Sequence, residues 1–401
     1  MHDVFVSGAG PAGSVAALEL ARAGLDVVLV DREGFPRHKI CAGGLSFKSV
    51  RLLTEDLGLD LSSPLVQTMA PGGSIYYRYQ KVGEVVDSAS PLSFVSRYDF
   101  DDFLRGEAVK AGATFIPQWR VGEVDIRDGV VTGPSGERLQ ARHLIGADGM
   151  NGVTARTLRG KLPSNRGVGV AIEVEVPFSR EAMRARLGSE LFPELHFGVL
   201  DVGYGWVFPK RGRLTVGLGG LIETNRRLRA RFEEFCERLE LGVAWQDLPR
   251  LAYRLPFGGF VRRPARERLL LVGDAAGFAE PLLGEGIFYA MLSGVLAARA
   301  VIRARRSSSK AKASRDSDAA SAYVHAMRGL VADFQAGVWL RNLAYHPRLE
   351  PLLMRTLREV PQVSGLAARL LAGEIGFREL RRRCFLLSPW VLVRILARRA
   401  A

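Results

Sequence analysis

A glycine-rich turn joins a short apolar strand to a helix near the start of the sequence. The stretch "DVFVSGAG" predicts a strand that runs into the turn, "PAGSVAALELARAG" a helix that ends at Gly24, and "DVVLVD" the next strand. The turn has the spacing G-x-G-x-x-G at Gly8, Gly10 and Gly13, and Asp31 closes the second strand. These elements predict a βαβ unit and therefore a parallel, Rossmann-like sheet.

The residues of this unit suit a dinucleotide. Gly8 permits the tight turn, Gly10 lets the backbone approach a pyrophosphate, and Gly13 lets the helix pack closely. The helix N-terminus attracts phosphates, and Asp31 can accept hydrogen bonds from a ribose, while its carboxylate disfavours the 2'-phosphate of NADP here. An ordinary strand-to-helix turn is the alternative. The predicted binding residues are Gly8, Gly10, Ala12, Gly13, Asp31 and Arg32.

Length and composition set the class of protein. With 401 residues, 47% of them hydrophobic, the chain is long enough for one large domain or two closely packed ones. The sequence opens on a strand, without the features of a secretory signal, so we expect a cytoplasmic protein. Its cysteines, Cys41, Cys236 and Cys384, lie far apart and lack metal-ligand spacing, so we expect neither a disulfide framework nor a metal site.

A second motif lies far from the first, in "RLLLVGDAAGFAEPLLGEGIFYAML". An apolar strand ends in Gly273 and Asp274, and Gly284, Glu285 and Gly286 open a long apolar helix. "GDAAG" resembles the second flavin-contacting motif of FAD oxidoreductases with the p-hydroxybenzoate hydroxylase type of fold. This resemblance implies that the aspartate meets the ribityl chain and that the helix N-terminus faces the pyrimidine edge of the flavin, where it would stabilise negative charge. We predict Gly273, Asp274, Gly284, Glu285 and Gly286 as cofactor-binding residues, and the alternative for Glu285 is a carboxylate that only favours the helix dipole.

Two further segments complete the resemblance. "LIGADGMNGVTAR" is similar to the family's intermediate motif, with Asp148 and Gly149 at a strand end, and "SRYDFDDFLRGEAVKAGA" resembles its arginine-plus-helix segment, with Arg97 near the cofactor. The alternatives are a turn carboxylate for Asp148 and a solvated charge for Arg97. Four motifs in the expected order imply FAD as the cofactor.

Three stretches resemble one branch of that family, the geranylgeranyl reductases. They are "DREGFPRHKICAGGLS", "GDAAGFAEPLLGEGIFYAMLSG" and "YGWVFPK", and the resemblance covers residues 1 to about 300. The branch implies that Cys41 lines the flavin face, although a small, inert buried thiol is the alternative. "CAGG" departs from the usual glycine directly after the cysteine, which leaves the backbone path around Cys41 open.

An aromatic stripe lies in the stretch 195–222. The period of two residues and the turn "KRG" predict adjacent antiparallel strands, so Tyr204, Trp206 and Phe208 share one face. Such a face forms either core or the wall of a cavity. The resemblance favours the cavity for Tyr204 and Trp206, and an apolar aromatic wall suits a long prenyl chain.

The resemblance implies an FAD-dependent reductase that saturates carbon–carbon double bonds of a geranylgeranyl-type chain or a related isoprenoid lipid. The predicted catalytic residues are Cys41, Tyr204 and Trp206, and no histidine stands out as an acid. One nucleotide fingerprint is visible, which leaves NADPH, NADH and ferredoxin open as electron donor. An FAD monooxygenase or halogenase acting on an aromatic or polyketide substrate is the main alternative, although halogenases usually show Trp-x-Trp-x-Ile-Pro. A non-catalytic or electron-transferring flavoprotein is another.

The predicted fold class is α/β, with a Rossmann-like FAD-binding domain, an antiparallel β-sheet substrate domain and a helical C-terminal region. We expect the FAD-binding domain in 1–60, 96–155 and 265–305, the substrate domain in 61–95 and 156–264, and a linker and helices in 306–401. The polar run "RRSSSKAKASRDSDAASA" predicts a mobile loop or linker.

The net charge of +14 is compatible with nucleic acid or anionic membrane as a partner. Basic residues cluster in "RARRSSSKAKASR" and near the C-terminus without an RNA-binding aromatic motif, so we expect no nucleic acid. In 381–401, apolar and basic side chains together predict peripheral membrane contact, and a final helix packed on the protein is the alternative. The side chains concerned are Phe385, Leu386, Leu387, Trp390, Val391 and Leu392, with Arg381, Arg382, Arg383, Arg398 and Arg399.

Overall fold

A mostly parallel sheet, called the parallel sheet below, forms the first layer of the protein; in it β17, β10 and β9 pair antiparallel with their neighbours. The computed structural model describes residues 1–62, 64–160, 167–306 and 312–385. Within these residues the sheet has the order β17-β18-β11-β1-β2-β8, and β10 and β9 extend it at one side. Strand β1 pairs in parallel with both β2 and β11, as a Rossmann-like crossover requires. The bounds are β1 His2–Ser7, β2 Val27–Val30, β8 Thr114–Ile116, β9 Val124–Asp125, β10 Val130–Thr132, β11 Arg138–Gly146, β17 Ala265–Arg266 and β18 Leu269–Leu271.

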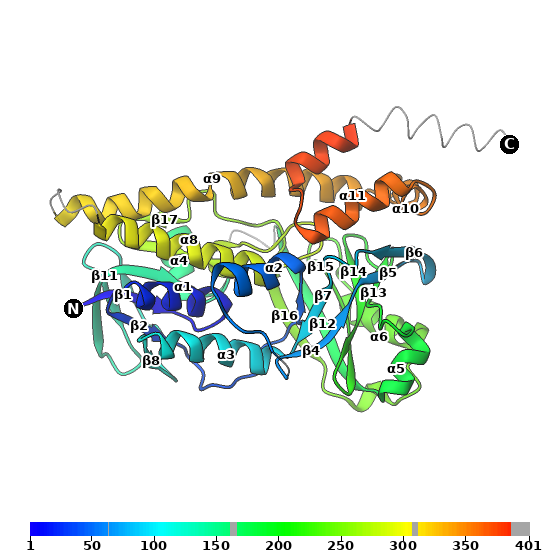
Figure 1. The fold of residues 1–401 in the computed structure, drawn as a ribbon, viewed down its shortest axis with the longest axis horizontal. Helices are drawn as coiled ribbons and strands as arrows, with labels where there is room; N and C mark the ends of the chain where they lie inside the picture. Colours follow the sequence, from blue (N-terminus) through cyan, green and yellow to red (C-terminus); the bar gives the residue numbers. More distant parts are fainter. Residues whose placement is uncertain (63, 161–166, 307–311, 386–401) are drawn as a thin grey trace.

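Helices cover this sheet, and α1 lies in contact with both α3 and α8 (Figure 1). Helix α8 packs against α1 at a glycine: a Cβ on Gly294 would lie 2.3 Å from the carbonyl oxygen of Ala12. By length and composition α8 could cross a membrane, but 67% of its apolar window is buried inside the protein. It is therefore a core helix of this fold. The bounds are α1 Pro11–Arg22, α3 Arg97–Lys110, α4 Val153–Arg159, α7 Gly273–Ala276 and α8 Ile287–Arg306.

The second large sheet has the order β16-β12-β15-β14-β13-β5-β6. Its strands are antiparallel neighbours, apart from the parallel pair of β13 and β5. A small sheet, β3-β7-β4, contains strands from the N-terminal third of the chain. The bounds are β3 Gly44–Leu45, β4 Val66–Ala70, β5 Gly72–Tyr77, β6 Gln80–Val86, β7 Leu92–Val95, β12 Val168–Pro177, β13 Glu194–Phe197, β14 Gly203–Lys210, β15 Arg213–Leu221 and β16 Leu251–Pro256.

The predicted aromatic stripe lies on β14, which pairs with β15 through the tight turn at residues 211–212. The rings of Tyr204 and Trp206 have centroids 5.9 Å apart, and those of Trp206 and Phe208 are 6.5 Å apart. On the face of this sheet opposite Trp206, apolar residues from β12, β14, β15 and α6 form a second hydrophobic core. The bounds of the remaining elements before α8 are α2 Phe47–Arg51, the π-helix η1 Leu52–Asp56, α5 Arg180–Leu187, α6 Leu228–Arg238 and the 3-10 helix η2 Trp245–Asp247.

A long helix, α9 (Lys312–Ala344), runs along one side of the molecule (Figure 1). It forms a hydrogen bond to the parallel sheet and another to the segment that follows the seven-stranded sheet's strand β16. The hydroxyl of Tyr323 donates to the carbonyl of Leu271, 2.9 Å away on β18 of the parallel sheet. Near the other end, the guanidinium of Arg341 donates to the carbonyl of Phe257, directly after β16 of the second sheet. Helix α9 is thus anchored beside each large sheet.

The C-terminal part is helical as predicted, with α10 Glu350–Glu359, α11 Pro361–Ala372 and a further helix over 377–385. The prediction of a loop or linker over the Ser-Lys-rich run is wrong from Lys312 onward, because these residues form the first turns of α9. Alanine and lysine in that run favour helix, and the serines do not prevent it. Residues 307–311 and 386–401 of the predicted linker and tail lie outside the described residues.

The fold class is confirmed: parallel and antiparallel sheets combine with helices, and the C-terminal region is helical. The strands of the parallel sheet fall in 1–60, 96–155 and 265–305, and those of the seven-stranded sheet in 61–95 and 156–264. The domain boundaries themselves stay a prediction.

The contact between α1 and α8 predicts a contrast between two helical glycines. We expect Gly294→Ala to destabilise the protein by about 1–3 kcal/mol, because its Cβ would meet the backbone of Ala12. Gly329→Ala, on α9, meets nothing within 4 Å and is expected to stabilise by up to about 1 kcal/mol. Urea unfolding followed by circular dichroism measures both. Equal effects of the two substitutions would show that the helices have room to separate.

Candidate active site

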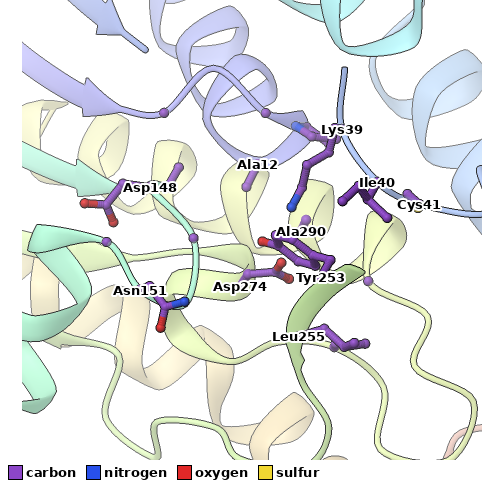
Figure 2. A pocket seen from close by; sticks show the side chains of 18 of the residues that line it. Ala12, Lys39, Ile40, Cys41, Asp148, Asn151, Tyr253, Leu255, Asp274 and Ala290 are labelled. Atoms are coloured by element: carbon purple, nitrogen blue, oxygen red, sulfur yellow. The ribbon is translucent and has the colours of Figure 1, made fainter. Parts of the chain in front are cut away.

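A cavity of about 890 Å³ lies between the parallel sheet and the seven-stranded sheet. This is at the upper end of the range for ligand pockets, about 300–1,000 Å³. Its walls come from the turn after β1, the segment 37–42, the loop after β11, the start of α8 and one face of the seven-stranded sheet. Figure 2 shows how side chains from these separate segments converge on the same space.

The turn after β1 is held by backbone contacts that leave no room for side chains. A Cβ on Gly8, which has a φ of +100°, would lie 2.4 Å from the carbonyl oxygen of Ala147. A Cβ on Gly13 would lie 1.9 Å from the carbonyl oxygen of Gly8. Gly8, Gly10 and Ala12 line the cavity, whereas Gly13 packs inward and does not. Helix α1 begins without a side-chain cap, so its first amides are available to a phosphate.

Asp31 lies at the end of β2, buried beside the turn. Its Oδ2 accepts a hydrogen bond from the amide of Ala9, 2.8 Å away, and its Oδ1 accepts one from the amide of Glu33, 3.0 Å away. The carboxylate therefore both braces the turn and lines the cavity. Arg32 also lines the cavity, but its side chain is mostly exposed and its Nε lies 3.4 Å from Glu33.

A buried cluster of two arginines and one aspartate lies beside this turn. Arg97, at the start of α3, forms a bidentate pair with Asp101, with N–O distances of 2.6 and 2.7 Å. Burial opposes the charge of Arg97, but the carboxylate of Asp101 outweighs it and raises the pKa of the guanidinium. Arg37 reaches Asp101 at 3.1 Å and lies 3.7 Å from where a Cβ on Gly10 would be. Arg37 lines the cavity, and we did not assign it from the sequence.

The segment around Cys41 has a defined path despite the inserted alanine. Cys41 lines the cavity, and its amide donates to Oε1 of Glu173, 2.9 Å away. Gly43 has a φ of +74°, and a Cβ there would lie 2.1 Å from the carbonyl oxygen of Val95. The position that needs glycine is therefore Gly43, while Ala42 lies before it without a positive φ.

Asp148 follows β11 and lines the cavity. Its carboxylate accepts hydrogen bonds from the amide of Thr154, at 2.9 Å, and from the hydroxyl of the same residue. Burial raises its pKa, against the effect of these hydrogen bonds. Gly149, the next residue of the motif, has a φ of +79° and also lines the cavity.

Asp274 points into the cavity, where Figure 2 shows it beside Tyr253 and opposite Lys39. The ammonium of Lys39 lies 2.9 Å from the centroid of the Tyr253 ring. Burial lowers the pKa of Lys39 to about 8, although the carboxylate of Asp274 opposes this. Neither Lys39 nor Tyr253 was assigned from the sequence. The lysine lies inside the stretch that carries the family resemblance, which was the signal available.

At the start of α8, the predicted glycines and the predicted glutamate lie in different places. Gly284 and Gly286 line the cavity, but Glu285 does not. Its Oε2 pairs with Lys48, 2.6 Å away, and its Oε1 accepts a hydrogen bond from Ser46. Gly273 also lies behind the wall, where its amide donates to the hydroxyl of Ser293 at 2.9 Å. The structure therefore gives Glu285 an ion-pair partner on α2 in place of a position in the cavity.

The seven-stranded sheet contributes an aromatic wall. Tyr204 and Trp206 line the cavity, and the hydroxyl of Tyr204 donates to the carbonyl of Leu283, 2.6 Å away. The indole of Trp206 lies over Gly217, where a Cβ would be 2.3 Å from the ring. Phe208 instead packs on Phe94, with ring centroids 5.2 Å apart. Two residues of the predicted stripe, Tyr204 and Trp206, therefore line the cavity, and the third, Phe208, packs against β7 instead.

The cavity suits a flavin dinucleotide. An uncapped helix N-terminus, the carboxylate of Asp31 and a second helix start lie around one space that is large enough for a long ligand. Among the residues that the structure describes, no cluster of His, Cys, Asp and Glu could hold a metal ion. The architecture and the cavity therefore define a dinucleotide-binding protein of the Rossmann-like class.

The comparison with known families agrees. The family described as "FAD binding domain" matches residues 1–313, so the chain belongs to this family of FAD-binding proteins. Its cofactor is FAD, and the protein is an FAD-dependent oxidoreductase.

Similar proteins are found among the reductases. The chain is 34% identical over 314 residues to the menaquinone reductase of Mycolicibacterium smegmatis, covering 74% of this chain and 75% of that one. It is 31% identical over 321 residues to digeranylgeranylglycerophospholipid reductase 2 of Methanothermobacter thermautotrophicus, covering 75% and 78%. The resemblance to geranylgeranyl reductases is confirmed.

Solved structures share the fold. A geranylgeranyl bacteriochlorophyll reductase-like protein from Thermoplasma acidophilum has a TM-score of 0.78 at 20% identity, covering 92% of this chain and 95% of that one. A flavin-dependent brominase has a TM-score of 0.69 at 19% identity, covering 93% and 94%. At these identities the likeness concerns the architecture alone.

The two carboxylates at the ends of β2 predict different effects on cofactor binding. We expect Asp31→Ala to weaken FAD binding about 10- to 150-fold, because a charge-assisted hydrogen bond is worth about 1.5–3 kcal/mol and the turn loses its brace. Asp26→Ala, at the exposed start of the same strand, removes a surface pair with His2 and is the control. Flavin fluorescence titration measures both. Equal affinities of the two variants would remove Asp31 from the binding site.

Proposed function

We propose that this FAD-dependent oxidoreductase saturates carbon–carbon double bonds in the prenyl chain of an isoprenoid lipid. The observation that carries the proposal is the aromatic wall of Tyr204 and Trp206, which faces the same cavity as the FAD-binding turn. A prenyl chain offers methyl and methylene groups and almost nothing to hydrogen-bond, so an apolar wall can hold it while polar groups hold the cofactor.

The names of the similar proteins support this substrate class. Menaquinone is a quinone with a prenyl side chain, and a digeranylgeranylglycerophospholipid carries two geranylgeranyl chains. The part that these two molecules share is the prenyl chain. We therefore place the reaction at a prenyl double bond and not at a quinone ring or a polar headgroup.

The chemistry asks little of the protein beyond positioning. When bound and reduced, FAD supplies a hydride to one alkene carbon. The protein must hold the alkene at the flavin, exclude water and provide a proton for the other carbon. Cys41, Tyr204 and Trp206 stay our candidates for the surface that positions the alkene. Halogenases share the fold, and they or monooxygenases would require oxygen, which separates the two functions.

The wall predicts a loss of turnover without a loss of cofactor. Trp206 is 6% exposed and lies on the cavity, so Trp206→Ala should leave FAD bound but slow reduction of the prenyl chain about 100-fold, because the alkene is no longer held in place. The assay follows anaerobic reoxidation of the dithionite-reduced enzyme by a digeranylgeranylglycerophospholipid in detergent micelles. Mass spectrometry then detects the hydrogens gained by the lipid.

Trp206→Phe, which keeps an aromatic ring, is the matched control and should lose far less. If wild-type flavin stays reduced with the lipid and is reoxidised only by oxygen, the protein is an oxygen-dependent enzyme of the same fold. Unchanged turnover in Trp206→Ala would instead place the alkene elsewhere in the cavity.

We also propose that the protein collects its substrate at a membrane surface. On α9 and the helix over 377–385, Trp339 is 40% and Phe385 60% exposed, with ring centroids 5.5 Å apart. Arg381 and Arg382 lie on the same terminal helix and are exposed. Apolar rings beside basic side chains are the features of interfacial segments, and each basic group near an anionic surface contributes about 1 kcal/mol. Of the predicted segment 381–401, residues 386–401 lie outside the described residues.

This surface predicts binding to anionic vesicles. The double variant Trp339→Glu and Phe385→Glu should sediment at least about ten-fold less with phosphatidylglycerol vesicles at low salt, because two large apolar side chains no longer enter the interface. Met69→Glu, which changes an exposed apolar residue on β4, should bind like wild type. Wild-type protein that ignores the vesicles at low salt would contradict the proposal.

A further inference from the structure

A buried carboxyl group stands on the cavity side of the seven-stranded sheet. In the register of the sheet, Glu173 on β12 pairs with Gly217 on β15, and Gly217 pairs with Trp206 on β14. Directly paired residues of neighbouring antiparallel strands project to the same face. Because Gly217 has no side chain, the indole of Trp206 lies across it, between the strand positions of Trp206 and Glu173 in the register of the sheet. The carboxyl group and the aromatic wall therefore face the same space, and both line the cavity.

The surroundings of Glu173 hold its carboxyl group in place. The residue is 4% exposed, and its Oε1 accepts the amide hydrogen of Cys41 at 2.9 Å. Among the residues that the structure describes, this amide is the hydrogen-bond donor found for the carboxyl group. A carboxyl group on a strand, tied to the loop opposite, has a defined position at the boundary of cavity and sheet.

Charged groups from three elements face this carboxyl group. The pKa of Glu173 is raised to about 7, chiefly by burial, and the negative charge of Glu175 on the same strand acts in the same direction. Lys210 on β14 and Arg97 on α3 act in the opposite direction, as does the amide of Cys41. The ammonium of Lys210 is itself paired with Glu175 at 3.1 Å, so its charge is shared. Glu173 can therefore carry a proton near neutral pH and still release it.

The two tyrosine hydroxyl groups on this wall are less suited than the carboxyl group of Glu173 to give up a proton. Tyr204 donates its hydrogen to the carbonyl of Leu283, and burial raises its pKa above the usual value. Burial also raises the pKa of Tyr253, which lies beside Lys39 and Asp274. Glu173, in contrast, carries a carboxyl group and lies in the same row of paired residues as Trp206, on the same face of the sheet.

We propose that Glu173 is the general acid that protonates the substrate alkene. This inference rests on the proposed prenyl reduction. The π bond of the alkene breaks, one carbon forms a C–H bond with the hydride of reduced FAD, and the other forms a C–H bond with the proton of Glu173. The alkene gains two electrons, FAD is the two-electron oxidised product, and Glu173 is left as a carboxylate that regains a proton from water.

The test compares Glu173→Gln with Glu173→Asp in the FAD-loaded protein. Glutamine keeps the size of the side chain and an oxygen for the amide of Cys41, but it has no acidic proton. We expect both variants to bind FAD and to be reoxidised by oxygen like wild type. With a digeranylgeranylglycerophospholipid in micelles and no oxygen, the glutamine variant should reoxidise about 100-fold more slowly, and aspartate should restore part of the rate.

The pH profile separates an acid from a structural group. Because Glu173 must be protonated to act, the wild-type anaerobic rate should fall as pH rises through about 7. The residual rate of Glu173→Gln should lack this fall, which a purely structural role would leave in place.

Each outcome decides the inference. A slow, pH-independent glutamine variant with normal FAD binding supports it. A glutamine variant as fast as wild type overturns it and leaves prenyl reduction intact. Loss of FAD in both variants assigns Glu173 to the fold and also overturns it. Wild-type enzyme that is not reoxidised by the lipid overturns prenyl reduction first, and the general acid with it.

Discussion

The contact between the backbone of Gly13 and the carbonyl of Gly8 determines where the rest of the cavity lies. Helix α1 can approach β1 only because no Cβ separates them, and the same turn meets Ala147 after β11 through Gly8. The ends of β1 and β11 and the start of α1 therefore lie next to one another. There the N-terminus of α1 borders the cavity, and Asp31 reaches the turn from the next strand.

The opposite wall depends on glycine in a different way. Gly217 and Gly219 on β15 leave space on the sheet, and the indole of Trp206 occupies it. With side chains at these positions the ring would have to stand away from the sheet and into the cavity. The sheet therefore presents a broad apolar surface to the cavity, and the carboxyl group of Glu173 lies beside that surface. The two faces of the cavity differ in character: backbone amides and charges on one side, rings and one acid on the other.

Sequence patterns predicted the parts of the site that depend on local backbone geometry. Gly8, Gly10 and Asp31 belong to one short unit whose spacing is dictated by a turn and a strand, and the stripe on β14 follows from a period of two. Glu173 could not be found in this way, since an acidic residue in an alternating strand is typical of a solvent-facing position. Its environment arises from a contact with Cys41, 132 residues away in the sequence. Arg37 and Lys39 lie in the stretch that carries the family resemblance, but their contacts with Asp101 and Tyr253 join segments far apart in the sequence. The first turns of α9 were misassigned because their composition is typical of linkers and also compatible with helix.

Helix α9 acts as a strut between the two large sheets. Its 33 residues span about 50 Å. Tyr323, in its first half, reaches β18, and Arg341, near its C-terminal end, reaches the segment after β16. A rod fixed at both sides resists any motion that would swing one sheet away from the other. Helix α9 thereby ties the two sheets that enclose the cavity to each other.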